Sequence, residues 1–118
     1  MFWVSSYFLK EDKAAVYQQW LLSPEAKALM ADVQRETGMR YVDTYWTVLG
    51  FGDFDCEDWW ELPNWAAIDV MREAQSVERL FMRTWELGYF DPSRSARQRV
   101  LRTTEDIKTW SPPDKSED

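Results

Sequence analysis

The sequence predicts an α+β domain in which a four-stranded antiparallel sheet carries its helices on one face. Segments rich in aromatic and β-branched residues alternate with segments of helical periodicity, in the order β-α-β-β-α-β. The chain of 118 residues has the length of one domain, and 45% hydrophobic with 30% charged residues is a globular composition. We expect residues 1–110 to form that domain and residues 111–118, SPPDKSED, to be a disordered tail.

The first half of the chain is predicted to contain a strand followed by two helices. Residues 2–9, FWVSSYFL, have the aromatic and β-branched content of a strand, and residues 14–22 have the spacing of a short helix. A second helix begins with Ser23 as its N-cap and Pro24 at its first position. Gly38 then ends this helix, because glycine readily adopts the left-handed conformation that follows a helix.

The second half is predicted to contain a hairpin, an interrupted helix and a last strand. Two strands flank a glycine-rich turn, which indicates a hairpin. Proline starts the next helix, a serine restarts it, and a glycine ends it. The expected elements are strands at 40–49, 57–62 and 98–104 and helices at 63–74 and 76–88. Right-handed connections turn this order into a ferredoxin-like fold.

Composition argues against several classes of partner and location. A formal net charge of −7 opposes binding to nucleic acid, and no apolar run is long enough to span a membrane. Arg94, Arg97, Arg99 and Arg102 cluster, which indicates either a local anion site or solvated arginines on a strand. The single cysteine, Cys56, cannot form an internal disulfide, and the N-terminus lacks signal-peptide features. We therefore expect a cytoplasmic protein.

The absence of histidine limits the possible chemistry. Catalytic triads that need histidine, imidazole ligation of haem and histidine-based zinc sites are all excluded by a chain with no histidine. Any general acid or base is then Asp, Glu, Tyr, Lys or Cys56. Acids at positions 53–58 are spaced partly like a calcium loop, but the glycine and closing glutamate of that loop are missing. We expect neither a metal nor another cofactor.

The sheet face without helices is predicted to be rich in rings and carboxylates. Side chains alternate between the two faces of a strand, so the strand sequences divide into two sets. A register shift of one residue would exchange the sets. A face this aromatic ordinarily meets a partner, and a second copy would enclose a pocket for an aromatic small molecule. The residues predicted to lie on this face are Trp3, Ser5, Tyr7, Tyr41, Asp43, Tyr45, Thr47, Glu57, Trp59 and Glu61.

This layout resembles the dimeric α+β barrel superfamily, which includes small antibiotic-biosynthesis monooxygenases and polyketide cyclases. The resemblance covers residues 1–104 and rests on the order of elements, the chain length and the Trp-Glu-Leu-Pro end of a strand at 60–63. It implies a homodimer. Asn64 and Trp65 resemble by position an asparagine and tryptophan that bind and activate substrate in cofactor-independent members. The haem-using branch normally needs a histidine, which this chain lacks.

The candidate site combines these residues with the aromatic face. Asp43, flanked by two tyrosines, is the candidate that moves a proton, because rings that exclude water raise the pKa of a carboxyl group. Its alternative role is a buried acid satisfied by hydrogen bonds, and that of Asn64 is a helix cap. Trp65 is alternatively a core residue. The predicted catalytic residues are Asp43, Tyr45 and Asn64, and the predicted substrate-binding residues are Trp3, Tyr7, Tyr41, Trp59, Glu61, Trp65 and Trp85.

The function predicted from this site is a cofactor-independent enzyme of a biosynthetic pathway. Its substrate would be a hydrophobic, aromatic or polyketide-like small molecule, changed by cyclisation, isomerisation or oxygenation. One alternative is a dimeric accessory protein that binds such a molecule without turnover. Another is that the uncovered face contacts a different protein and encloses no pocket.

Overall fold

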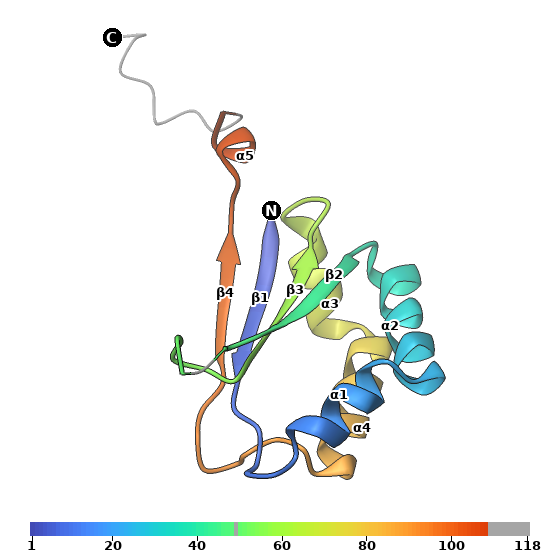
Figure 1. The fold of residues 1–118 in the computed structure, drawn as a ribbon. Helices are drawn as coiled ribbons and strands as arrows, with labels where there is room; N and C mark the ends of the chain where they lie inside the picture. The colour runs from blue at the N-terminus through green and yellow to red at the C-terminus, as the bar shows by residue number, and fades with distance from the viewer. Residues whose placement is uncertain (49, 109–118) are drawn as a thin grey trace, which may run out of the picture.

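The computed structural model describes residues 1–48 and 50–108, and it has the α+β architecture that the sequence predicts (Figure 1). Leu49, at the end of a predicted strand, and the predicted tail at 111–118 lie outside the described residues. The elements are β1 (Phe2–Tyr7), α1 (Ala14–Leu21), α2 (Pro24–Thr37), β2 (Arg40–Trp46), β3 (Cys56–Glu61), α3 (Ala66–Glu73), α4 (Gln75–Leu87), β4 (Arg97–Leu101) and α5 (Thr104–Lys108).

The four strands form an open antiparallel sheet in the order β2-β3-β1-β4. Helices α1 to α4 lie on one side of this sheet, and no described element covers the other side (Figure 1). Two clusters of buried apolar side chains fill the space between the sheet and the helices. One is centred on Trp3, Trp60 and Met30, and the other on Tyr17, Trp20 and Cys56.

Local sequence signals account for the bounds of the longer helices. Ser23 has an extended backbone and its Oγ accepts a hydrogen bond from the Ala26 amide at 3.2 Å, so it caps α2 as predicted. Gly38 and Gly88 end α2 and α4 with φ of 76° and 71°, a region that glycine adopts without strain. Ala74, with an extended backbone, separates α3 from α4. The prediction places this break one residue later, at Gln75.

The C-terminal end of the described chain differs from the prediction. The last strand stops at Leu101, and residues 104–108 form the short helix α5, which the sequence analysis does not predict. The side-chain carboxylate of Asp106 accepts a hydrogen bond from the Thr103 amide at 2.9 Å, which is a local cap at the start of this helix. Among the described residues, no helix combines the length and the hydropathy needed to cross a membrane.

The face predicted for β1 is wrong. β1 pairs Trp3 with Trp60 and Tyr7 with Cys56, and all four side chains lie in the buried clusters under the helices. The sequence FWVSSYFL is apolar or small at both alternating positions, so alternation does not define which face is buried. Phe2, whose ring packs against Trp59 at 5.5 Å between centroids, lies on the uncovered face instead.

A β-bulge changes the face of one further predicted residue. The pairing of β2 with β3 shifts between Tyr41 and Asp43, so Tyr41 pairs with Trp60 while Asp43 pairs with Trp59. Tyr41 therefore lies on the helix-covered face, and its ring packs against Trp60 at 5.1 Å between centroids. Asp43 lies on the uncovered face, as predicted.

Candidate functional site

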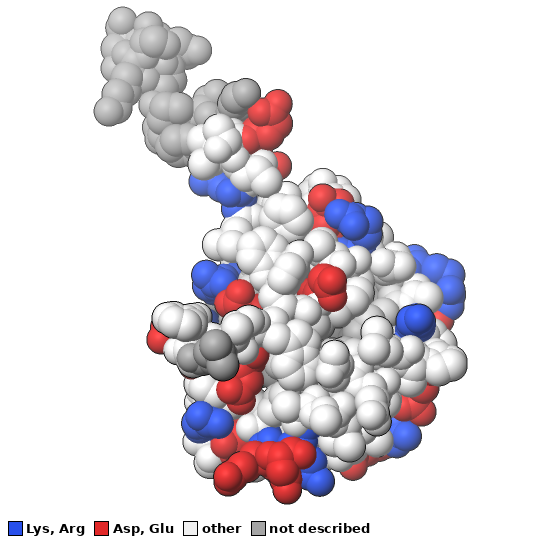
Figure 2. All heavy atoms as spheres, viewed as in Figure 1, with Lys and Arg blue, Asp and Glu red and all other residues white. Residues whose placement is uncertain are grey.

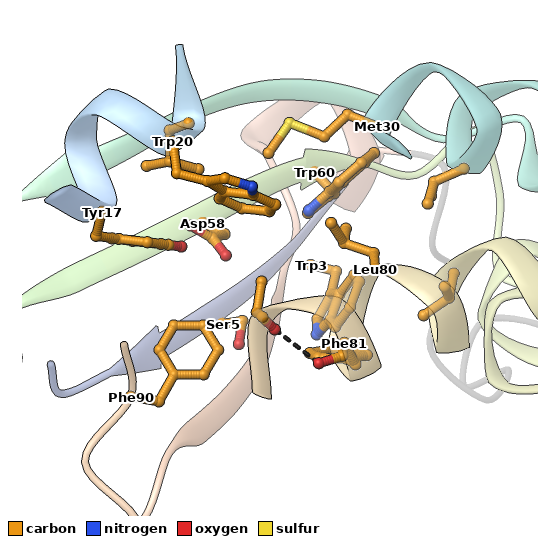
Figure 3. Close-up of a pocket in the computed structure, with 14 residues that line it drawn as sticks. Trp3, Ser5, Tyr17, Trp20, Met30, Asp58, Trp60, Leu80, Phe81 and Phe90 are labelled. Atoms are coloured by element: carbon orange, nitrogen blue, oxygen red, sulfur yellow. Dashed lines mark hydrogen bonds between the residues drawn. The ribbon is translucent and has the colours of Figure 1, made fainter. Parts of the chain in front are cut away.

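A cavity lies between the sheet and the helices, and its wall is mostly aromatic (Figure 3). The space between atoms is about 530 Å³, including a part that is open to solvent, and the free volume within it is about 40 Å³. That free space has room for roughly three water molecules. The six rings of the wall come from β1, β3, α1, α4 and the loop before β4 and belong to Trp3, Tyr17, Trp20, Trp60, Phe81 and Phe90.

The cavity contains one ionisable acid, Asp58 of β3. Its Oδ1 accepts a hydrogen bond from the Tyr7 hydroxyl at 2.7 Å and another from Thr44 Oγ1 at 2.7 Å. Protein surrounds Asp58 on its other sides, but the part of its surface that borders the cavity remains accessible to solvent. In Figure 3 the carboxylate points into the space between Tyr17, Trp20 and Phe90.

Two chains of hydroxyl groups converge on this carboxylate. Tyr7 and Thr44 each have one hydroxyl proton, and each donates it to Asp58. The Tyr17 hydroxyl, 2.6 Å from that of Tyr7, must then donate to Tyr7, and the Tyr41 hydroxyl must donate to Thr44. Two protons are thus donated to Oδ1 and the other two to the hydroxyl oxygens that donate to it, which is an arrangement that orients a carboxylate and stabilises its charge.

The pKa of the Asp58 carboxyl group is raised from 3.8 to about 6. Burial is the main cause because a charged carboxylate loses hydration inside the protein, and the hydrogen bonds from Tyr7 and Thr44 lower the pKa in part. None of the ion pairs in the described part of the chain includes Asp58. The group therefore changes charge close to neutral pH.

The phenols and the thiol near Asp58 stay protonated at neutral pH. Burial raises the pKa of Tyr7, Tyr17 and Tyr41, with the charge of Asp58 adding to the effect. Burial also raises the pKa of the Cys56 thiol, which makes it unreactive as a nucleophile. Asp58 is thus the group of this network that can exchange a proton near pH 6.

A second, more open groove meets the cavity at Asp58. The two spaces share the lining residues Ser5, Asp58, Phe81 and Phe90. Trp85 borders the groove from α4, where its ring contacts Phe90 at 6.2 Å between centroids. The groove gives a route by which a molecule from solvent can approach the carboxylate.

The structure brings some of the predicted site residues together around this cavity. Trp3 lines the cavity, and Tyr7 donates a hydrogen bond to Asp58. The Tyr41 hydroxyl is hydrogen-bonded to Thr44, the other hydroxyl group that contacts Asp58. Trp85 borders the outer groove. The geometry places these residues on the helix-covered side of the sheet, whereas the sequence analysis places Trp3, Tyr7 and Tyr41 on the other side.

The other predicted residues lie elsewhere. Asp43 and Tyr45 are exposed on the uncovered face, where Trp59 packs against Tyr45, so the desolvation expected for Asp43 is not present in the single chain. Glu61 forms an ion pair with Arg40 at 3.1 Å. Asn64 Oδ1 accepts a hydrogen bond from the Ala67 amide at 3.1 Å, which is the helix-cap role. Trp65 is 57% exposed beside it.

Asp58 is the residue of this cavity that the sequence alone does not identify as a candidate, together with Tyr17, Trp20 and Phe90. A signal for Asp58 exists in the strand sequence CEDWWE. Trp60 is predicted to face the helices, and side chains two residues apart share a face, so Asp58 must lie under the helices as well. An acid at the centre of a strand on its buried face is unusual and indicates a functional site.

No known protein-family model matches this chain, and no curated protein is similar enough to count as a relative. Over residues 1–48 and 50–108, no three Cys, Asp or Glu side chains gather in a way that could hold a metal ion. The geometry of the cavity is therefore the observation on which a function is proposed.

Proposed function

We propose that this chain binds a small hydrophobic or aromatic molecule in the cavity and acts on it without a cofactor, using Asp58 as a general base. The observation that supports this proposal is a carboxylate without a cationic partner, set among aromatic rings and open to the cavity. The reaction classes that fit are cyclisation, isomerisation or oxygenation, because each can begin with removal of a proton next to a carbonyl group.

The electrostatics of Asp58 suit proton transfer at neutral pH. A base works best when its pKa lies near the working pH, and the pKa of Asp58 is about 6. The hydroxyl groups of Tyr7 and Thr44 occupy Oδ1, and among the described residues no hydrogen bond reaches Oδ2. Oδ2 is therefore the atom that would accept the proton of a bound molecule.

The alternative function is binding without turnover. The free space admits only about 40 Å³ of water-molecule centres, so a ligand of several fused rings fits only if side chains of the wall move. A cavity with so little free space suits a protein that sequesters a small product as well as one that transforms it. The two functions differ in whether Asp58 exchanges a proton with the ligand.

A generic proton-transfer substrate distinguishes them. Nitrobenzisoxazole opens to a coloured phenolate when a base removes its ring proton and the N–O bond breaks, with the electron pair ending on oxygen. We expect the wild-type protein to catalyse this reaction and Asp58→Asn to lose about a hundredfold in rate, the usual contribution of a general base. The rate should rise with pH through about 6 and then level off, because Asp58 must be ionised to accept the proton.

Two variants control this experiment. Asp69→Asn makes the same chemical change at an exposed position of α3 and should retain the wild-type rate. Asp43→Asn tests the carboxylate predicted from the sequence. If Asp43→Asn loses activity and Asp58→Asn retains it, the general base is Asp43 on the uncovered face and not Asp58. Binding of the compound with no reaction in any variant would support the accessory role.

We further propose that a second copy covers the uncovered sheet face, giving a ferredoxin-like dimeric α+β barrel. The order of elements and the strand order β2-β3-β1-β4 support this fold assignment. Arg97 and Arg99 lie on β4 at one edge of the sheet, and the exposed Asp43 lies on β2 at the other. A two-fold axis parallel to the strands would place these opposite charges over one another.

A further inference from the structure

We infer that the cavity recognises a small organic ammonium ion, a protonated amine whose nitrogen lies among the rings beside the Asp58 carboxylate and whose hydrophobic body reaches the outer groove. This inference rests on the proposed function, since it names the class of ligand for the same cavity. It comes from the combination of one carboxylate with a wall of aromatic rings.

The carboxylate determines the sign of the charge that the cavity can hold. Among the described residues, the wall of the inner cavity includes no Lys or Arg, and Asp58 is its one carboxylic acid. An anionic ligand would be repelled by Asp58, and a neutral ligand would leave the ionised carboxylate without an ion-pair partner. A cationic ligand supplies the missing partner and offsets the cost of burying the charge.

The rings of the wall favour the same ligand. Aromatic faces carry a negative quadrupole and attract cations, and several rings around one site form the kind of cage that binds alkylammonium groups. Tyr17, Trp20 and Phe90 surround the carboxylate in Figure 3. An ammonium group placed beside the Asp58 carboxylate would therefore contact ring faces as well as a negative charge.

The size of the space limits the ligand. The inner cavity admits about 40 Å³ of water-molecule centres, which suits an ammonium head group. The outer groove, of about 260 Å³, includes Phe81, Trp85 and Phe90, so it suits an aromatic or alkyl body. Its wall also includes Asp91 and Arg94, which form an ion pair with each other at 3.0 Å. The formal net charge of −7 also attracts cations to the molecule as a whole.

The test compares three probes of equal size, benzylamine, benzyl alcohol and benzoate, by calorimetry at about pH 8, where Asp58 is ionised. We expect benzylamine to bind at least about tenfold more tightly than benzyl alcohol, and benzoate to bind most weakly. The preference for the amine should disappear at about pH 5, because Asp58 is then protonated. Tyr7, Tyr17, Tyr41 and Cys56 face Asp58, and all four stay protonated across this range.

Two variants make the result specific to the site. Asp58→Asn should abolish the preference for the amine, and Asp69→Asn should retain it. Phe90→Leu removes one ring face without changing charge, and it should lower the affinity for benzylamine more than that for benzyl alcohol. Phe90→Leu keeps the test decisive if Asp58→Asn does not fold.

Three outcomes would overturn the inference. Equal binding of benzyl alcohol and benzylamine would show that charge is not recognised, and the proposed function would still stand if nitrobenzisoxazole is converted. An amine preference that persists in Asp58→Asn would place the recognition at a surface acid. Failure of all three probes to bind would exclude amines as the ligand class. The rates with nitrobenzisoxazole would still test the proposed function independently.

Discussion

Asp58 is held in a charged form that its surroundings disfavour. Its pKa of about 6 exceeds the ordinary value of 3.8, so the folded protein binds this proton more tightly than the unfolded chain. The contribution of Asp58 to stability is therefore fully present below about pH 4 and is lost as the pH rises through about 6. By neutral pH the loss amounts to roughly 3 kcal/mol of unfolding free energy. Such a cost at a cavity wall is typical of a functional residue.

Replacing this carboxylate by an amide should stabilise the protein at neutral pH. Asp58→Asn keeps an oxygen that accepts from Tyr7 and Thr44 and removes the buried charge. We expect the free energy of unfolding in urea to rise by about 1–3 kcal/mol at pH 7, with the gain shrinking towards pH 4. Asp69→Asn should show no such pH-dependent gain. A loss of stability in Asp58→Asn that is equal at both pH values would contradict this account.

At the scale of elements, the junction of α1 and α2 positions one wall of the cavity. Ser23 Oγ donates to the Trp20 carbonyl at 2.5 Å and accepts from the Ala26 amide, so it ends one helix and starts the next. Trp20 Nε1 donates to Glu25 at 2.7 Å, and Glu25 pairs with Arg83 of α4 at 3.0 Å. These contacts fix the Trp20 ring over the cavity and connect three helices.

Removing the cap tests this junction. Ser23→Ala should lower the free energy of unfolding by about 1 kcal/mol, the usual value of an N-cap side chain. Urea denaturation followed by far-ultraviolet circular dichroism measures it. Ser95→Ala, in the exposed loop before β4, serves as the matched control and should change stability little. Equal effects of the two substitutions would show that the Ser23 hydroxyl does not stabilise the junction.

The helices and strands also show which features of the fold can be predicted from the sequence alone. Helix starts and ends at Ser23, Gly38 and Gly88 are predictable because caps depend on local chemistry. The face of β1 is not, since its residues are apolar or small at both alternating positions. In β3 acids occupy both faces, and Asp58 is the one that shares the face of Trp60, where it pairs with Ser5 under the helices. Alternation in β3 therefore identifies the covered carboxylate, whereas alternation in β1 does not identify the covered face.

At the scale of the whole molecule, both signs of charge occur on the face seen in Figure 2, so the net charge is not concentrated in one acidic patch there. The uncovered side of the sheet combines apolar rings with separated charges. Tyr45 is 49% exposed on that side and contacts Trp59, and Arg99 pairs with Glu57 at 2.9 Å. A surface of this kind suits association with a second copy.

Placing a charge in this surface tests the dimer. We expect size-exclusion chromatography with light scattering to give the mass of a dimer for the wild type and of a monomer for Tyr45→Lys, because a cation in a closed interface loses its hydration. Met82→Lys, at an equally exposed position of α4, should remain dimeric. A monomeric wild-type protein would rule out the dimeric barrel while leaving the cavity between sheet and helices in place.

The central claim is that Asp58 is a buried carboxylate that titrates near neutral pH inside an aromatic cavity. Its own titration tests this most directly, by following the carboxyl carbon in a nuclear magnetic resonance spectrum and assigning it by its absence in Asp58→Asn. The account predicts a pKa of about 6. A midpoint near the ordinary value of 3.8 would mean that water reaches the group freely, and it would contradict the proposed role of Asp58.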